Sequence, residues 1–377
     1  MITKLIVSNY KSIGPKTLIK FGKLTALVGQ NGSGKSNIID IFKFLSDCMV
    51  LGLEGAITKR YGIKALRRWS GGQPLNLSIE ISITEKDFKA SYKFEITSHK
   101  KHDYIVKYEK AEIFYNTGES YKYEIANQKW VEGLVDLKPT LDPLNLALPL
   151  ISGDIRIAPL GDVLRNIQIY SIYPDNLRTP QKYDPVKPMA QHGNNWISIL
   201  KDQDEKTWKP ELISALNQLT NEIDEIEIKQ LSGYLLARFR HGLSGKSSKA
   251  KWFDASQESD GTLRIAGIIS ALLQNPALPI VGIEEPELTI HPGAISLLFD
   301  FINQAAKTSQ VILTTHSPEI LDHLKPEQVR IIEKSKDYTK VHEMSEEGVE
   351  IVKSKLMSLG ELHRTQGLDY HQLKLEL

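Results

Sequence analysis

The chain has 377 residues, of which 41% are hydrophobic and 25% are charged, as in a soluble globular protein that is long for a single core. Its 47 basic and 46 acidic residues nearly cancel, so the overall charge favours neither nucleic acid nor membrane, and any DNA contact requires a local basic patch. Cys48 is the only cysteine, which excludes internal disulfides and argues against a thiolate zinc site.

Apolar runs in this sequence are short. None approaches the roughly 20 residues of a membrane helix, and the nearest, 144–151, contains Pro149. Residues 2–7 begin directly after Met1, without the layout of a signal peptide. We therefore expect a cytoplasmic protein with no membrane segment.

The N-terminal region predicts short strands at 5–7 and 18–21, followed by a buried strand at 24–28. Gly29–Ser36 then reads Gly-Gln-Asn-Gly-Ser-Gly-Lys-Ser, which fits the phosphate-loop pattern G-x-x-x-x-G-K-[ST] without a mismatch. Residues 37–45 place their apolar side chains on one helical face. Strand, glycine-rich loop and helix are the arrangement that directs backbone N–H groups at a phosphate.

The loop residues have separate expected roles. Lys35 should reach the β- and γ-phosphates of a nucleotide, and the Ser36 hydroxyl should ligate Mg²⁺. The nucleotide-binding residues predicted from the loop are Gln30, Asn31, Gly32, Ser33, Gly34, Lys35, Ser36 and Asn37.

The middle of the chain changes character. Residues 47–73 show no regular pattern, and we expect an irregular segment there. It carries a basic cluster that either contacts phosphates of nucleotide or DNA or forms a solvated face. From 75 to about 135 apolar and polar residues alternate, which predicts an antiparallel sheet. The four residues of the cluster are Arg60, Lys64, Arg67 and Arg68.

Further along, 137–159 contains four prolines and is expected to be a loop, before a strand at 167–173. Helical spacing follows at 196–200 and 211–219, then a strand at 234–239 and a Gly/Ser/Lys-rich turn at 241–251.

The last third alternates strands, at 280–283, 311–314 and 329–332, with helices such as 294–306, which predicts a parallel sheet covered by helices. Because the phosphate loop lies near the N-terminus, one sheet must be assembled from both chain ends. The predicted fold class is an α/β P-loop NTPase fold with a mixed sheet and a β-rich, then helical, insertion. The expected segments are 1–75 (first part of the nucleotide-binding domain), 76–255 (insertion) and 256–377 (second part of that domain).

Two carboxylates end the apolar strand at 280–283. Consecutive strand side chains point in opposite directions, so one carboxylate can face Mg²⁺ and the other the γ-phosphate. We assign Glu284 to Mg²⁺, through water, and Glu285 as the general base for an attacking water. A pair of solvated acids is the alternative, and the phosphate loop makes it the weaker interpretation.

Two further sites come from position in the chain. His316 follows an apolar strand, where ligands bind in open α/β sheets, and it either contacts the γ-phosphate or is a structural surface histidine. Ser259 precedes a helical pattern at 263–273, and a helix N-terminus is an anion site. Because the chain's phosphate loop already serves one nucleotide, we assign Ser259, Asp260, Gly261 and Thr262 to a neighbour's γ-phosphate, although a simple helix cap explains these residues equally well.

Taken together, these motifs resemble an ABC-type ATPase head of the branch that contains SMC, RecF and the ATPase portion of OLD-family proteins. The chain is most similar to small bacterial "AAA family ATPases" of that branch, many of them associated with phage defence. The resemblance rests on Asn9-Tyr10-Lys11-Ser12, on Gly29–Ser36, on Ser259-Asp260-Gly261-Thr262, and on Ile283–Glu287 with Thr315-His316-Ser317.

This resemblance implies ATP as the nucleotide and a head-to-tail homodimer that holds two ATP molecules. Each lies between the phosphate loop of one subunit and Ser259–Thr262 of the other, with Lys11 or Ser12 near the nucleotide. The sequence departs from the family in having Glu284 where Asp is usual, and Gln73 is the nearest candidate for the glutamine that links Mg²⁺ and water. About 60 residues follow His316 in this sequence, fewer than the domain of an OLD-type nuclease is expected to need.

We therefore expect an ATP-hydrolysing dimeric switch that couples head closure to DNA or to a separately encoded effector protein such as a nuclease, in bacterial antiphage defence. One alternative is a RecF-like, ATP-gated DNA clamp in repair, with a groove built from the basic cluster. Another is a scaffold that binds ATP without hydrolysing it. A transporter engine is the least favoured, because the signature differs and no membrane segment is predicted.

Overall fold

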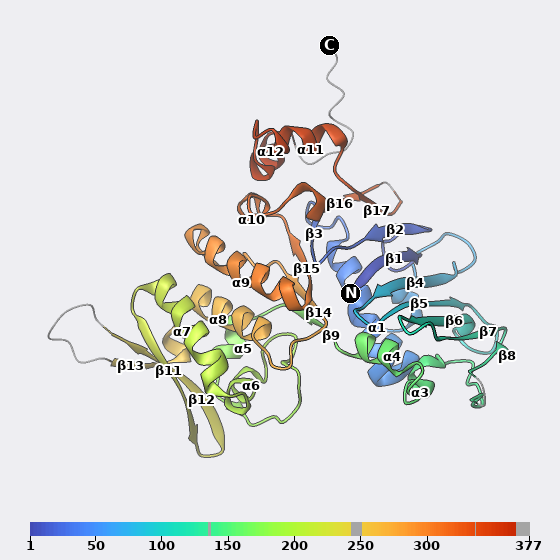
Figure 1. Cartoon of the computed structure of the whole chain (residues 1–377), viewed down its shortest axis with the longest axis horizontal. Helices are drawn as coiled ribbons and strands as arrows, with labels where there is room; N and C mark the ends of the chain where they lie inside the picture. Colours follow the sequence, from blue (N-terminus) through green and yellow to red (C-terminus); the bar gives the residue numbers. More distant parts are fainter. Residues whose placement is uncertain (135–136, 243–250, 336, 367–377) are drawn as a thin grey trace, which may run out of the picture. The chain divides into compact units, whose positions relative to one another are not determined.

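The computed structural model describes residues 1–134, 137–242, 251–335 and 337–366. The chain divides into two compact units. Figure 1 shows the whole chain, with colours that follow the residue number. The first unit contains Met1–Ile167 and Lys325–Met357, and the second contains Gln168–Leu324 and Ser358–Arg364. Within the described ranges, no helix combines the length and apolarity that crossing a membrane would require. Most of the turn predicted at 241–251 falls on residues 243–250, outside the described residues.

An antiparallel sheet forms much of the first unit, in the strand order β2-β1-β4-β5-β6-β7-β8. Along β4, every second side chain is buried, so the alternation seen in the sequence corresponds to one core face and one polar face. The antiparallel sheet predicted between 75 and 135 is confirmed. Its strands are β1 (Ile2–Ser8), β2 (Thr17–Lys20), β4 (Leu77–Thr84), β5 (Phe88–Thr97), β6 (Ile105–Tyr115), β7 (Ser120–Ala126) and β8 (Lys129–Glu132).

Helix α1 (Lys35–Thr58) extends well beyond the helix predicted at 37–45 and kinks at Gly52, where φ is 72°. The expectation of an irregular segment at 47–73 was therefore wrong over its first half, because Met49, Leu53 and Ile57 continue the buried face. The short helix α2 (Ile63–Leu66) follows.

Two short helices, α3 (Leu148–Ile151) and α4 (Ala158–Arg165), lie against α1 within and beyond the segment predicted as a loop. The loop was predicted because this segment is rich in proline. Pro149 and Pro159 occupy the first turns of these helices, where the missing N–H is not needed.

The basic cluster does not form one exposed surface. Arg60 and Arg67 are each only 8% exposed. Arg60 is paired at 2.8 Å with both Asp40 and Asp47, and its guanidinium lies over the Phe44 ring. An arginine can be buried in this way because two carboxylates on α1 neutralise it. The interpretation that all four basic residues form one solvent-facing patch is therefore wrong.

A second sheet of the first unit joins the two ends of the chain. Strand β3 (Leu24–Val28) runs parallel to β16 (Val329–Lys334), with Val28 opposite Ile331, and β16 pairs antiparallel with β17 (Thr339–His342). The predicted mixed sheet built from both chain ends is confirmed. Helix α11 (Glu346–Lys353) also belongs to this unit.

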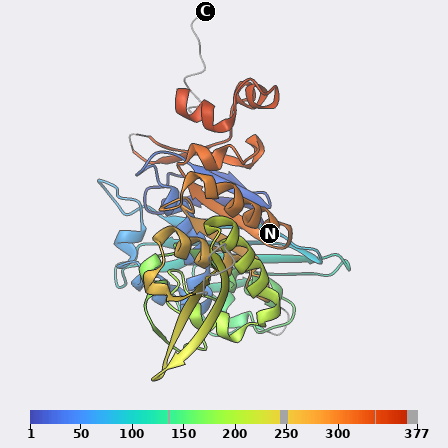
Figure 2. The ribbon, with the colours of Figure 1, turned by 90° about the vertical axis from the view of Figure 1, so that its left-hand side faces the viewer.

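In the second unit, β14 (Ile280–Glu284) runs parallel to β15 (Gln310–Thr315), in the order β15-β14-β9. Helix α9 (Ile295–Thr308) contacts both β15 and α8 (Asp260–Leu272). A β11–β12 hairpin extends as a long ribbon in both views (Figures 1 and 2). The remaining elements are β9 (Ile167–Tyr170), α5 (Pro174–Arg178), β10 (Gln181–Lys182), α6 (Trp196–Asp202), α7 (Glu205–Thr220), β11 (Ile223–Leu231), β12 (Tyr234–His241), β13 (Lys251–Asp254), α10 (Pro318–Leu321) and α12 (Leu359–Gln366).

The buried charges of α1 generate a stability prediction. Arg60→Met leaves the carboxylates of Asp40 and Asp47 without their main partner, so the free energy of unfolding should fall by about 3–5 kcal/mol. Lys93→Met, which breaks an exposed pair with Glu80, should cost less than about 1 kcal/mol. Urea denaturation measures both, and equal losses would contradict the role given to Arg60.

The same cluster predicts a dependence on pH. Burial by itself would raise the pKa of Asp40, but hydrogen bonds and charge from Arg60, with the charge of Lys11, outweigh it and hold the pKa below its ordinary value. A carboxyl with a lowered folded-state pKa stabilises the protein above its unfolded pKa of about 4 and loses that effect as the pH falls further. The stability difference between wild type and Arg60→Met should therefore narrow below about pH 4.

Candidate functional site

The phosphate loop in the first unit connects the fully buried strand β3 to α1. Gly32 and Gly34 have φ of 77° and 112°, which L side chains rarely adopt. A Cβ on Gly34 would also overlap the Thr339 side chain, and one on Gly29 would overlap the Ile332 carbonyl oxygen. The glycines at these positions are therefore required by the turn and by close packing.

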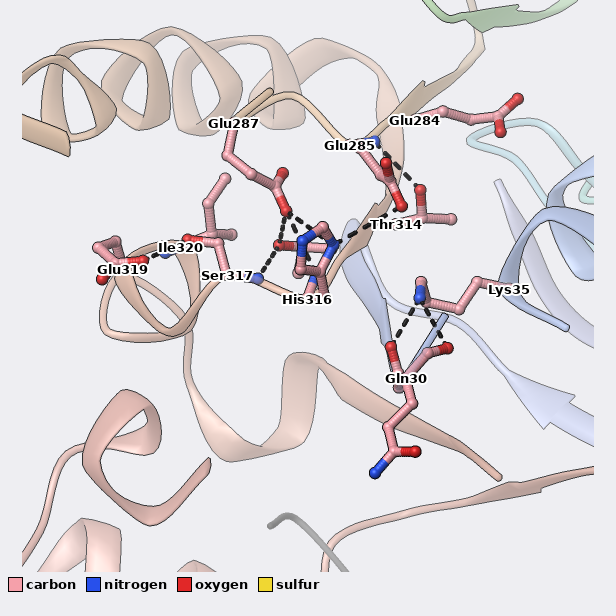
Figure 3. Close-up of polar contacts among 12 residues, drawn as sticks. Gln30, Lys35, Glu284, Glu285, Glu287, Thr314, His316, Ser317, Glu319 and Ile320 are labelled. Carbon is pink, nitrogen blue, oxygen red and sulfur yellow. Dashed lines mark hydrogen bonds and ion pairs between the residues drawn. The ribbon is translucent and has the colours of Figure 1, made fainter. Parts of the chain in front are cut away.

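Lys35 is folded back over the loop and is only 5% exposed. Its Nζ donates to the carbonyl oxygens of Gly29, at 2.6 Å, and Gln30, at 3.1 Å (Figure 3). The Ser33 hydroxyl is buried and has no hydrogen-bond partner among the described residues. Ser36 is exposed. A cationic amine, an unsatisfied hydroxyl and an open serine fit a phosphate group with a metal ion.

A hydroxyl chain ties the N-terminal motif to this loop. Thr339 Oγ1 donates to the Ser33 carbonyl oxygen at 2.8 Å, so Ser12 Oγ, also 2.8 Å from Thr339 Oγ1, is the donor in their shared bond. Ser12 in turn accepts from Asn37 Nδ2 at 2.7 Å. Ser12 therefore lies beside the loop within the first unit, while its place near the nucleotide stays a prediction. Lys11, at φ 48°, is instead paired at 2.5 Å with Asp40 on α1.

Thr339 is a site residue that the sequence analysis missed. No motif marks it, and it lies 306 residues from Ser33. The signal available was indirect: the strand predicted at 329–332 enters the same sheet as the loop strand, so the next strand would pass near the loop.

In the second unit, β14 and β15 end side by side and bring Glu285 close to His316. Glu285 Oε1 lies 3.6 Å from His316 Nδ1, within ion-pair distance but beyond hydrogen-bond distance. Figure 3 shows the Glu284 side chain pointing away from this pair. The Glu285 backbone has φ 44°, and its N–H donates to the Thr314 carbonyl oxygen at 3.0 Å.

Glu287 is a second residue to which the sequence analysis gave no role. Its Oε1 accepts from Thr315 Oγ1 at 2.6 Å and from the His316 backbone N–H at 3.2 Å, and it lies 3.8 Å from His316 Nδ1 (Figure 3). The Glu287 side chain is almost fully buried. Its only sequence signal was its place in the Glu-Glu-Pro-Glu motif. A buried carboxylate at this point fixes the turn that carries the histidine.

The signature residues form the start of α8. Ser259 Oγ accepts from the Thr262 backbone N–H at 3.1 Å, so the predicted helix cap is present. A Cβ on Gly261 would lie 2.9 Å from the Thr289 carbonyl oxygen, which leaves little room for a side chain. Asp260 pairs with Arg178 of α5. The cap by itself does not decide whether this helix end also binds a phosphate, so that role stays a prediction.

Gln73 lies in a bend and is exposed, and its carbonyl oxygen accepts from Ser70 Oγ. Its assignment as the glutamine linked to Mg²⁺ also stays a prediction.

A family model described as "AAA domain, putative AbiEii toxin, Type IV TA system" matches residues 24–140 and 158–322. One similar solved structure is an Smc head bound to the C-winged helix domain of ScpA, at 17% identity and a TM-score of 0.51, covering 94% of this chain and 99% of that chain. Another is an Smc head domain with an extended coiled coil from Pyrococcus furiosus, bound to the C-terminal domain of ScpA, at 15% identity and a TM-score of 0.52, with the same coverage. No curated protein matches the sequence. The likeness confirms the predicted ABC-type ATPase head fold.

The geometry of the loop predicts that Lys35→Ala removes nucleotide binding, because the ammonium group is the main positive charge placed at the loop. Titration with a fluorescent ATP analogue measures this, and Lys89→Ala, which removes an exposed lysine from β5, is the matched control. Micromolar ATP affinity retained by Lys35→Ala would contradict the assignment.

Proposed function

The chain belongs to the family described as "AAA domain, putative AbiEii toxin, Type IV TA system", and on that premise we propose that it is an ATP-hydrolysing dimeric switch. The observation that carries the proposal is the Glu285–His316 pair, held 3.6 Å apart at the ends of adjacent strands, in a chain that also contains a complete phosphate loop. A carboxylate beside a histidine supplies the proton acceptor and the proton donor that general acid–base catalysis uses.

Each group has a chemical role in this proposal. The loop N–H groups and Lys35 bind the phosphates. Ser12 accepts a hydrogen bond from Asn37 just after the loop, and Lys11 is paired with Asp40 of α1. Ser36 and Glu284 would hold Mg²⁺, which supplies neutralisation of phosphate charge. Glu285 accepts a proton from the water that attacks the γ-phosphorus, and the bond to ADP breaks. His316 donates to the γ-phosphate oxygens.

The number of anion sites supports the proposed dimer. Each chain has one phosphate loop and, at the start of α8, a helix N-terminus that is capped by Ser259. Asp260 would repel a phosphate, but its charge is matched by Arg178. We assign Ser259–Thr262 to the γ-phosphate bound by the partner subunit, so that ATP joins two subunits and hydrolysis releases them.

The partner of the switch is proposed by chemistry and family. The family description names a toxin of a toxin–antitoxin system, which favours a role in bacterial antiphage defence with a separately encoded effector protein, such as a nuclease, as the recipient of the motion. The two Smc head structures carry a bound protein domain, which favours a protein recipient. A RecF-like DNA clamp is less favoured, since two arginines of its expected groove are buried.

Glu285→Gln tests the chemistry. The amide cannot accept the proton, so kcat for ATP hydrolysis should fall by at least about 100-fold, while ATP binding is retained and an ATP-dependent dimer accumulates on size-exclusion chromatography.

Glu205→Gln, which alters an exposed carboxylate of α7, is the control. Normal turnover by Glu285→Gln would assign the base to another residue. A wild-type protein with no measurable ATPase, unchanged by the substitution, would favour the non-hydrolysing scaffold.

Ser259→Arg tests the dimer. A bulky cation at the start of α8 should leave ATP affinity unchanged but abolish ATP-dependent dimerisation and ATPase activity. Ser214→Arg places the same side chain on the exposed face of α7 as the control. Circular dichroism checks that both variants are folded, and a dimer that still forms in Ser259→Arg would overturn the assignment of the signature residues.

A further inference from the structure

Arg264 is a buried arginine on α8 that no motif marks. It lies five positions after Ser259 in the same helix and is only 4% exposed. Its Nη1 donates to the Ile172 carbonyl oxygen at 2.8 Å, and its Nη2 donates to the Glu285 carbonyl oxygen at 2.9 Å. The Glu284 carbonyl oxygen lies 3.5 Å from Nη2. All of these residues belong to the second unit.

The guanidinium holds the backbone of the turn that carries Glu284, Glu285 and Glu287, here called the acidic turn. Burial lowers the pKa of Arg264, and the charges of Glu287 and Glu285 oppose that effect. Arginine keeps its proton even at such sites. Its Nε is buried and has no hydrogen-bond partner in the described ranges, so part of the donor capacity of the group is unused. An arginine with a purely structural role would be expected to have a hydrogen-bond partner for its Nε as well.

The backbone conformation of Glu285 has to be held in place by hydrogen bonds from other residues. Its φ of 44° lies in the left-handed region, which a residue with a long side chain rarely adopts unless its surroundings hold it there. On one side its N–H is fixed by the carbonyl oxygen of Thr314, at 3.0 Å. On the other side its carbonyl oxygen is fixed by Arg264. The direction of the Glu285 carboxylate toward His316 therefore depends on a side chain of the signature helix.

We propose that Arg264 is a positioning residue, which couples the start of α8 to the orientation of the general base Glu285. The inference rests on the proposed function. Ser259 and Arg264 lie on one rigid helix, so a shift of α8 when its N-terminus engages a nucleotide also moves the guanidinium that holds the Glu285 carbonyl. A displacement of about 1 Å at such a group is enough to change the alignment of the base and thus the rate of the chemical step.

Arg330 provides a matched control within the same chain. It is also a buried arginine, 8% exposed, and among the described residues it donates to the backbone carbonyl oxygens of Lys20, Glu327 and Val329. Burial lowers its pKa too. Arg330 lies on β16 of the first unit and contacts neither the phosphate loop nor the acidic turn in any of these bonds. Substitution there should lower stability without a selective effect on catalysis.

The experiment compares Arg264→Gln, Arg264→Lys and Arg330→Gln with wild type in the full-length protein. For Arg264→Gln we expect kcat for ATP hydrolysis to fall by about 10–100-fold, with the Kd for ATP and the ATP-dependent dimer unchanged within about threefold. Arg264→Lys retains one donor and the charge, so it should recover part of kcat. Arg330→Gln should keep the wild-type kcat, although thermal unfolding shows a comparable loss of stability.

The outcomes are separable. Wild-type kcat in Arg264→Gln, or an equal loss of kcat in Arg330→Gln, overturns the inference. Loss of ATP affinity in parallel with kcat also overturns it, because the effect would then be one of general structure. If Arg264→Gln does not fold, Arg264→Lys carries the same comparison. Absence of ATPase in the wild type is a failure of the proposed function instead, and it is detected before any variant is compared.

Discussion

The parallel pairing of β3 with β16 is the constraint on which the nucleotide-binding half depends. It brings a strand from the beginning of the chain beside one that begins at Val329, and the next strand then starts at Thr339, directly against the phosphate loop. The close approach excludes any side chain at Gly34 and lets a threonine hydroxyl hold the loop carbonyl. Without this long-range pairing, the glycine-rich turn would lose its packing against Thr339 and the hydroxyl that joins the Ser33 carbonyl oxygen to Ser12.

Local patterns in the sequence predicted a large part of the fold and of the candidate site. The antiparallel sheet, β3, β14, β15, β16 and the cap at Ser259 all follow from periodicity or from the chemistry of single residues, which act over a few positions. The helices around Pro149 and Pro159 were missed because proline is compatible with a first helical turn. The extent of α1 was missed although Met49, Leu53 and Ile57 continue its buried face beyond residue 45. Thr339, Arg264 and the partners of Arg60 could not be found, since each acts on residues that only the folded chain brings near.

Both units bury charged side chains, so the charged residues counted in the sequence do not all lie on the protein surface. Glu109 is almost fully buried and accepts from the hydroxyls of Tyr92 and Tyr123 and from the backbone N–H groups of Ala147 and Leu148. Burial raises the pKa of Glu109, and these four donors oppose the rise. The carboxylate fastens the start of α3 to the sheet, so a segment that seemed a loop is held in a defined place. Arg60 serves the same purpose for α1, as a cation surrounded by carboxylates.

The second unit also contains a buried arginine, Arg264, which lies beside the proposed general base Glu285. Arg60 neutralises side chains, whereas Arg264 donates to main-chain oxygens and leaves the carboxylates of Glu285 and Glu287 available to the His316 turn. A general base must be ionised and must point in one direction. A guanidinium bound to its carboxylate would fix that direction, but it would also occupy the carboxylate oxygens that have to accept the proton. Fixing the carbonyl oxygen instead holds the left-handed backbone of Glu285 and leaves its side chain unblocked. Under the proposed function, the position of this arginine on the helix that carries the signature residues has a purpose. A helix that engages the partner subunit's nucleotide would then also control when the proposed base is aligned.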